Sequence, residues 1–145
     1  MNLRQIYILS AFTFLYFIGF GQDISSHKVP QAIMQHFQKT YPKAYDVEWE
    51  MDGNLYKVEF ELGLLEVEHE IWYTEDGTIV RHKEELDKAS TPKSIQSYIS
   101  ENYQGYHIDD VDKIVEDNQT FYRVEIKSVA GKLKLLFDQN GKIID

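Results

Sequence analysis

Cysteine is absent from this 145-residue chain, and the residue patterns that mark catalytic or metal sites are absent too. Without cysteine there is no disulfide, no thiol nucleophile and no cysteine-ligated zinc. None of the five histidines shows the paired spacing of a helical zinc site, and no glycine-rich loop could cradle a phosphate. The sequence therefore predicts a protein that is not an enzyme, with no cofactor and no metal site.

Positive charge is also scarce. The chain has 15 Lys and Arg against 24 Asp and Glu, a net charge of −9, which becomes −10 if Arg4 is removed with residues 1–21. Residues 22–90 carry 15 acidic and 7 basic residues (−8), whereas residues 91–145 carry 9 and 7 (−2). Nucleic acids and anionic membranes bind basic surfaces, so neither is an expected partner.

Residues 1–21 have the pattern of a secretion signal. Arg4 supplies a positive charge, an apolar run follows over residues 6–20, and Gly19 and Gly21 precede a cleavage site before Gln22. The run is shorter than the roughly 20 residues of a membrane-spanning helix. We therefore expect a periplasmic or secreted protein without a membrane attachment after cleavage; an uncleaved anchor is the alternative.

The rest of the chain is a tandem repeat. The segment from Val29 to Val80 is echoed from Thr91 to Ile144, with Pro30 matching Pro92 at an offset of 62. The offset is 66 for the strand Tyr-x-Val-Glu-Phe/Ile beginning at residues 56 and 122, and 64 for the Asp-Gly and Asn-Gly turns at residues 76 and 140. Two copies of one unit account for residues 22–145, which leaves little sequence for a separate catalytic domain.

Each unit is predicted to be one helix followed by four strands. Apolar residues recur every fourth position near residues 30–41 and 92–103, with Thr91 as a candidate N-cap, and alternate with polar ones afterwards. The fold class is then α+β, with repeats over 22–90 and 91–145, each a helix packed on one face of its own four-stranded antiparallel sheet. The expected buried strand residues are Trp49, Tyr56, Val58, Phe60, Val67, Ile71, Tyr122, Val124, Leu133, Leu135 and Phe137.

These features resemble a known family. A signal followed by tandem helix-plus-four-strand units, with a proline near each helix start and an aromatic-x-x-(Asp/Asn)-Gly-x-Ile hairpin late in each unit, is similar to the PepSY-like proteins of Gram-negative bacteria. These proteins are also called β-lactamase-inhibitor-like. The resemblance covers roughly residues 25–145. It implies a periplasmic or secreted binding module that inhibits or chaperones a protein, and it implies no catalytic residues.

Two apolar pairs are predicted on the sheet face that points to water. If Gly63-Leu64 is a two-residue turn, Leu55 lies opposite Trp72, and the same register in the second repeat sets Phe121 opposite Leu136. In one interpretation these side chains cover another part of the same chain. In the other they form an exposed strip that binds a partner protein or peptide, since aromatic residues dominate binding energy.

A row of glutamates is predicted on the same face, with Glu59 opposite Glu68 and Glu61 opposite Glu66. Like charges directly opposite each other destabilise a sheet slightly. The four could be a hydrated surface, the contact for a basic partner, or a calcium site, because calcium prefers carboxylate oxygens.

Three functional classes remain. The first is a non-catalytic module that binds or inhibits a protein through the exposed sheet face, and this is the function we expect. The alternative is a sensor of a small ligand or calcium. The third is a hydrolase with His69 or His82 next to a carboxylate in a deep pocket.

Overall fold

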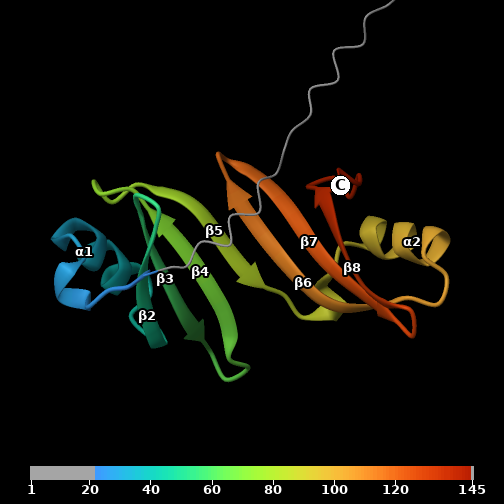
Figure 1. Ribbon diagram of the computed structural model, residues 1–145, viewed down its shortest axis with the longest axis horizontal. Coiled ribbons are helices and arrows are strands. Elements are labelled where there is room, and N and C mark those ends of the chain that lie inside the picture. Colours follow the sequence, from blue (N-terminus) through green and yellow to red (C-terminus); the bar gives the residue numbers. More distant parts are fainter. Residues whose placement is uncertain (1–21, 145) are drawn as a thin grey trace, which may run out of the picture.

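The computed structural model describes residues 22–144, and the predicted signal at 1–21 lies outside the described residues. Eight strands form one antiparallel sheet in which every strand neighbours the next in sequence. Two α-helices lie at opposite ends of it (Figure 1). The elements are β1 (Gln22–Asp23), a 3-10 helix (Ser26–Lys28), α1 (Gln31–Thr40), β2 (Tyr45–Asp52), β3 (Leu55–Leu62), β4 (Val67–Tyr73), β5 (Ile79–Glu85), a 3-10 helix (Lys88–Ser90), α2 (Lys93–Asn102), β6 (His107–Glu116), β7 (Gln119–Ser128) and β8 (Gly131–Asp138).

The prediction of two separate four-stranded sheets is wrong. β5, the last strand of the first repeat, pairs along its length with β6, the first strand of the second, from Arg81 opposite Glu116 to Glu85 opposite Asp112. The strand count per repeat also differs, because the second repeat contributes three strands and an isolated bridge between Phe137 and Ile143. Side-chain alternation identifies strands but carries no signal for which backbone edges join.

Both helices form where the apolar spacing predicts them and begin directly after a proline. The prediction of Thr91 as N-cap is wrong, because the cap position is Pro92 and the Thr91 hydroxyl donates to the Lys88 carbonyl oxygen instead. The prolines suit the helix start, where an N–H group would have no partner within the helix.

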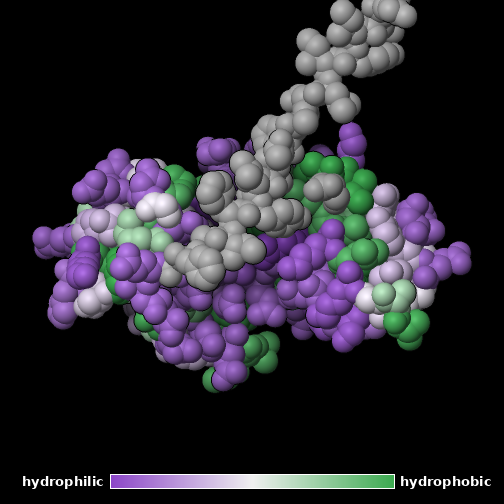
Figure 2. Space-filling view, viewed as in Figure 1, coloured by the Kyte–Doolittle hydropathy of each residue, from purple (hydrophilic) through white to green (hydrophobic). Residues whose placement is uncertain are grey.

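The core consists of two clusters on the helix side of the sheet. In the first, Ile33 and Phe37 of α1 pack on β2, β3 and β4; in the second, Ile95 and Ile99 of α2 pack on β6, β7 and β8. β5 contributes no buried residue, so it separates the clusters. Hydrophilic residues accordingly lie across the middle of the molecule, between the ends that carry α1 and α2 (Figure 2).

Most of the expected core residues are buried. Tyr56, Val67 and Tyr122 are only half-buried. The prediction that Leu133 is buried is wrong, because 40 % of its surface is exposed. Leu133 lies on β8, the last strand of the sheet, and in residues 22–144 only the strand β7 lies alongside it. The predicted residues that are buried are Trp49, Val58, Phe60, Ile71, Val124, Leu135 and Phe137.

Candidate functional site

The sheet face opposite the helices, called here the open face, is crossed by ion pairs that run from strand to strand. Each pair joins an acidic residue on one strand to a basic residue on the next, and together they link six strands. The series is Glu50 (β2), Lys57 (β3), Glu70 (β4), Lys83 (β5), Asp112 (β6) and Arg123 (β7). The open face is thus neutralised along its centre.

Lys57 is the most enclosed cation of this series, with 9 % of its surface exposed. Its Nζ lies 2.9 Å from Glu50 Oε1 and 2.7 Å from Glu70 Oε2, and it also contacts Glu59. Burial alone would lower the pKa of Lys57, but hydrogen bonds to the three glutamates outweigh burial and raise it. For Glu70, burial would raise the pKa, but bonds from Lys57 and Lys83 lower it. Both groups are therefore held charged.

Trp72 lies on the open face but is covered by the protein's own side chains. Lys57 Nζ and Arg81 Cζ lie 5.3 Å and 5.2 Å from its ring centroid, which is the geometry of cation–π contacts. Its Nε1–H donates to Asp52 Oδ2 at 2.7 Å. Only 7 % of Trp72 is exposed, so it has little surface to offer a partner.

Both predicted hairpin registers are wrong by two residues. The β3–β4 turn has four residues, Gly63 to Glu66, so Trp72 lies opposite Lys57 and Leu55 lies opposite Asp52 of β2. In the second repeat Leu136 lies opposite Arg123. A shift of two keeps each side chain on its face and changes its neighbours. The repeats thus set a cation, not an apolar residue, opposite Trp72 and Leu136.

The other two residues of the predicted apolar pairs are half-buried on the open face. Leu55 is the first residue of β3. Phe121 lies opposite Ile114 of β6 on one side and Asp138 of β8 on the other. The four residues do not form one strip, since Leu55 and Phe121 stand on strands separated by β4, β5 and β6.

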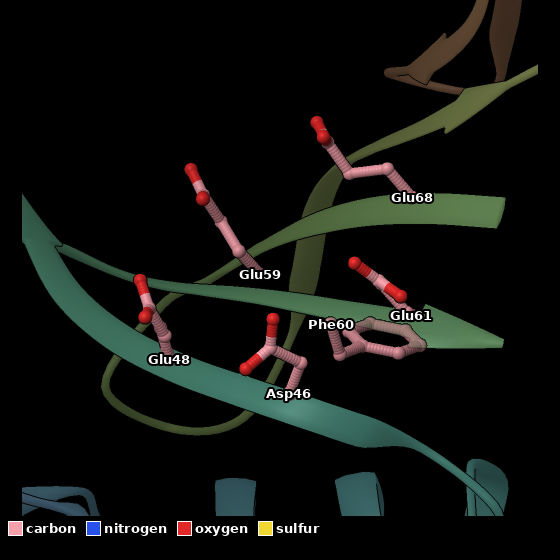
Figure 3. A pocket seen from close by; sticks show the side chains of 6 residues that line it. All are labelled: Asp46, Glu48, Glu59, Phe60, Glu61 and Glu68. Atoms are coloured by element: carbon pink, nitrogen blue, oxygen red, sulfur yellow. The ribbon is translucent and has the colours of Figure 1, made fainter. Parts of the chain in front are cut away.

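The glutamates do gather. Glu59, Glu61 and Glu68 line a hollow of about 130 Å³ with Asp46, Glu48 and Phe60, here called the acidic hollow (Figure 3). Its carboxylates come from β2, β3 and β4 and rise from the same side of the sheet (Figure 3). Glu66 is not among them, because it lies in the turn with a φ of 54°.

Like charges face each other directly across strands in the acidic hollow. Glu48 lies opposite Glu59, and Glu61 lies opposite Glu68. Glu59 contacts Lys57, and Glu68 lies 3.4 Å from Lys83. Within residues 22–144, Asp46, Glu48 and Glu61 form no ion pair. The hollow is therefore a part of the open face where negative charge is only partly compensated.

Sequence reasoning missed two acids of the hollow and the cations that border it. Asp46 has a φ of 51° and lies in a β-bulge between Tyr45 and Glu48, which brings it beside Glu48. A bulge of this kind leaves no clear trace in a sequence. Lys57 could be placed on the open face from its alternation with Glu59 and Glu61, whereas Lys83 stands between Arg81 and Glu85 and gives no such signal.

His69 and His82 form a pair on the helix side of the sheet. His69 Nδ1 lies 3.1 Å from His82 Nε2, and the two rings are stacked. Burial lowers the pKa of both, and for His82 the neighbouring His69 lowers it further. Neither residue lines the acidic hollow, and the pair packs against Phe60 and Tyr41 as part of the interior.

Among residues 22–144, no group of three or more His, Asp or Glu side chains is arranged to hold a metal ion. No helix in the same range is long and apolar enough to cross a membrane.

A family model described as "Putative beta-lactamase-inhibitor-like, PepSY-like" matches the chain twice, over residues 20–81 and 63–145. The two matches follow the tandem repeat, and the chain belongs to this family. No curated protein matches the sequence.

Solved structures from Bacteroides share the fold. A BLIP-like protein from Bacteroides fragilis is 24 % identical, with a TM-score of 0.64 over 80 % of this chain and 84 % of that one. A "putative periplasmic" protein from Bacteroides eggerthii is 16 % identical, with a TM-score of 0.70 over 81 % and 86 %. A DUF2874 family protein from Bacteroides uniformis is 21 % identical, with a TM-score of 0.68 over 80 % and 86 %.

Proposed function

We propose that this protein is a non-catalytic binding module of the periplasm or the exterior, and that its acidic hollow receives a basic surface of a partner protein. The observation that carries the proposal is the pair of cross-strand glutamate contacts, Glu48 with Glu59 and Glu61 with Glu68. Each contact costs a little stability, so a functional gain is the simplest reason to keep both.

The distribution of charge supports a basic partner. Elsewhere on the open face each buried acid has a cation beside it, as Glu70 has Lys57 and Lys83. In the hollow, where the acids are more exposed, Asp46, Glu48 and Glu61 have no cation beside them within residues 22–144, and residues 22–90 hold most of the net negative charge. A basic partner would supply the missing cations and would be steered to the hollow during approach.

Apolar contacts would come from the rim of the open face. Leu55, Phe121 and Leu136 keep part of their surface exposed, whereas Trp72 supports the face from within. The contact residues predicted from the sequence are these four together with Glu59, Glu61, Glu66 and Glu68. A partner that touches both repeats would have to tolerate the cations Arg123 and Lys134 beyond the hollow.

The location outside the cytoplasm is supported by the signal-like residues 1–21 and by the Bacteroides eggerthii protein's description as "putative periplasmic". The family's description as inhibitor-like names no reaction and supports a module that acts by binding. Whether binding inhibits the partner is a further step of the same proposal.

Calcium binding is the weaker alternative. The carboxylates of the hollow come from three strands and do not converge as a set of ligands within residues 22–144. Calcium needs six to eight oxygens around one point. A rise in melting temperature with added calcium, abolished by Glu61→Gln, would favour this alternative.

A comparative pull-down tests the proposal. The mature protein, its Glu61→Lys variant and its Glu101→Lys variant serve as baits in periplasmic extract of the native host. Glu101 lies exposed on α2, so its variant makes the same charge change outside the hollow. We expect the wild type and Glu101→Lys to retain one protein that Glu61→Lys loses. Equal recovery by all three baits contradicts the proposal.

A further inference from the structure

The outer edge of β8 is unpaired over part of its length. Near the end of the strand, Ile144 N–H donates to the Leu136 carbonyl at 2.7 Å, and Asp138 N–H donates to the Lys142 carbonyl at 2.9 Å. Between Lys132 and Leu135, residues 22–144 provide no strand on that side. We propose that this edge accepts an extended segment of a partner protein in which acidic and apolar residues alternate.

The repeat itself supports the proposal. β8 is the counterpart of β4, because Trp72-Tyr73 matches Leu136-Phe137 at the same offset of 64 as the turns that follow. In the first repeat β5 lies along β4, pairing His69 with Glu84 and Ile71 with His82. The matching positions in β8 are Leu133 and Leu135. An added strand would therefore occupy the place that β5 takes in the first repeat.

The free backbone groups can be assigned from the alternation of the strand. Residues of an antiparallel strand direct their N–H and C=O groups alternately to the two sides. Leu136 bonds outward to Ile144, so Lys134 and Lys132 also direct theirs outward. Leu133 and Leu135 direct theirs to β7. Two donors and two acceptors are thus available in a regular row, which is the basis of strand addition.

The side chains of the edge specify the chemistry of the partner. Lys132 and Lys134 lie on the open face, and their side chains are 51 % and 62 % exposed. Lys132 also pairs with Asp109 and Glu125, so Lys134, 3.9 Å from Glu125, is the less compensated of the two. Leu133 is 40 % exposed on the helix face, beside the buried Leu135. Residues opposite the lysines should be acidic, and residues between them should be apolar to cover Leu133.

A second copy of this chain fits less well. Two β8 edges pairing antiparallel would bring Lys132 and Lys134 of both copies together, which is repulsive. On the opposite edge of the sheet, β1 is the outermost strand and is only two residues long, and the rest of that edge is formed by β2, which is blocked. β1 and Ile24 cover it from Trp49 to Met51, and the bulge at Asp46 interrupts the rest.

The test uses a fluorescein-labelled heptapeptide of alternating valine and glutamate, with binding followed by fluorescence anisotropy. One control peptide has the same composition in two blocks, valine then glutamate. A second carries N-methyl groups at the glutamates, whose N–H groups would face β8. We expect the alternating peptide to bind and both controls to bind at least roughly tenfold more weakly. The N-methylated peptide loses two backbone hydrogen bonds, and in the block peptide the glutamates no longer share one face of the strand.

Variants of the protein locate the site. Lys134→Pro removes an outward N–H without removing a bond to β7, so the fold is retained, and we expect it to weaken binding by roughly tenfold. Lys134→Ala keeps the N–H and removes the charge; about a threefold loss, smaller at high salt, is expected. Lys43→Ala, the control, removes an exposed charge from the first repeat, away from β8, and should bind like the wild type. In the complex, amide exchange at Lys132 and Lys134 should slow.

Three outcomes overturn the proposal. The block peptide could bind as well as the alternating one, which would mean charge attraction alone. Lys134→Pro could bind with wild-type affinity. The protein could also form a dimer that Lys134→Pro abolishes, which would make the occupant a second copy. None of these outcomes would contradict the proposal for the acidic hollow. That proposal is tested by Glu61→Lys, which lies on β3 and leaves β8 unchanged.

Discussion

Replacing Lys57 by methionine should destabilise the fold strongly although the residue lies on the uncovered face of the sheet. Lys57 neutralises Glu70, of which only 8 % is exposed, and separates it from Glu50 and Glu59. Removing one partner of a buried ion pair costs about 3–5 kcal/mol, and because Lys83 stays beside Glu70 we expect about 3 kcal/mol. For a domain of this size that lowers the melting temperature by about 12 °C.

Urea unfolding of the single variant, of Glu70→Gln and of the double variant measures this directly. The double variant should cost about 1–2 kcal/mol less than the sum of the single ones, because the buried carboxylate that lacks its partner is gone. Lys43→Met, at an exposed lysine, should stay within about 0.5 kcal/mol of the wild type. A cost below about 1 kcal/mol for Lys57→Met, or strict additivity, would refute the reasoning.

The ion pair also fixes a pH dependence. The pKa of Glu70 is lowered from its usual 4.5, so its contribution to stability is present above that value and is lost as pH falls through the lower, folded-state pKa. The stability difference between the wild type and Lys57→Met should therefore narrow as the pH is taken below about 4.5. A difference that stays constant down to strongly acidic pH would mean that packing, not charge, accounts for the effect.

Two further predictions concern the turns and the histidine pair. Gly141 has a φ of 79°, and a Cβ there would meet Ser94 Cβ at 2.7 Å, whereas Gly53 has a φ of 63° and open space around it. Gly141→Ala should therefore cost about 3 kcal/mol and Gly53→Ala about 1 kcal/mol in urea unfolding, and equal costs would contradict the contact with α2. The pKa values of His69 and His82 are lowered from 6.5 in the folded protein, so the unfolded chain binds protons at a higher pH. The free energy of unfolding should therefore fall as the pH drops below about 6.5. Thermal unfolding between pH 7.5 and about 5 measures this dependence, and His82→Phe should reduce it.

The two helices, the identity of most strands and the assignment of residues to faces could be predicted from the sequence. Periodicity reports which side chains share a face, and it is insensitive to a register shift of two residues. The neighbours of Trp72 therefore could not be predicted, since they depend on whether the turn after Leu62 has two residues or four. The four-residue turn needs positive φ at both Gly63 and Glu66, and glutamate gives no sign of that.

The junction between the repeats was hidden for a different reason. β5 and β6 join through backbone hydrogen bonds, and β5, which has no buried residue, carries the mixed charged side chains of a strand beside water. In the candidate site, too, some residues could be placed from the sequence and others could not. Glu59, Glu61 and Glu68 could be placed on one face by alternation, whereas Asp46 joined them only through a bulge and Lys57 neutralises part of the row.

The rate at which the recovered partner associates with the protein tests the central claim most directly. Biolayer interferometry at low and high salt would compare the wild type with Glu61→Lys and Glu101→Lys. If the acidic hollow receives a basic surface, Glu61→Lys should slow association by roughly tenfold at low salt, with a much smaller effect at high salt and little change in dissociation. Association rates that are the same for all three proteins, or equally reduced by Glu101→Lys, would contradict it.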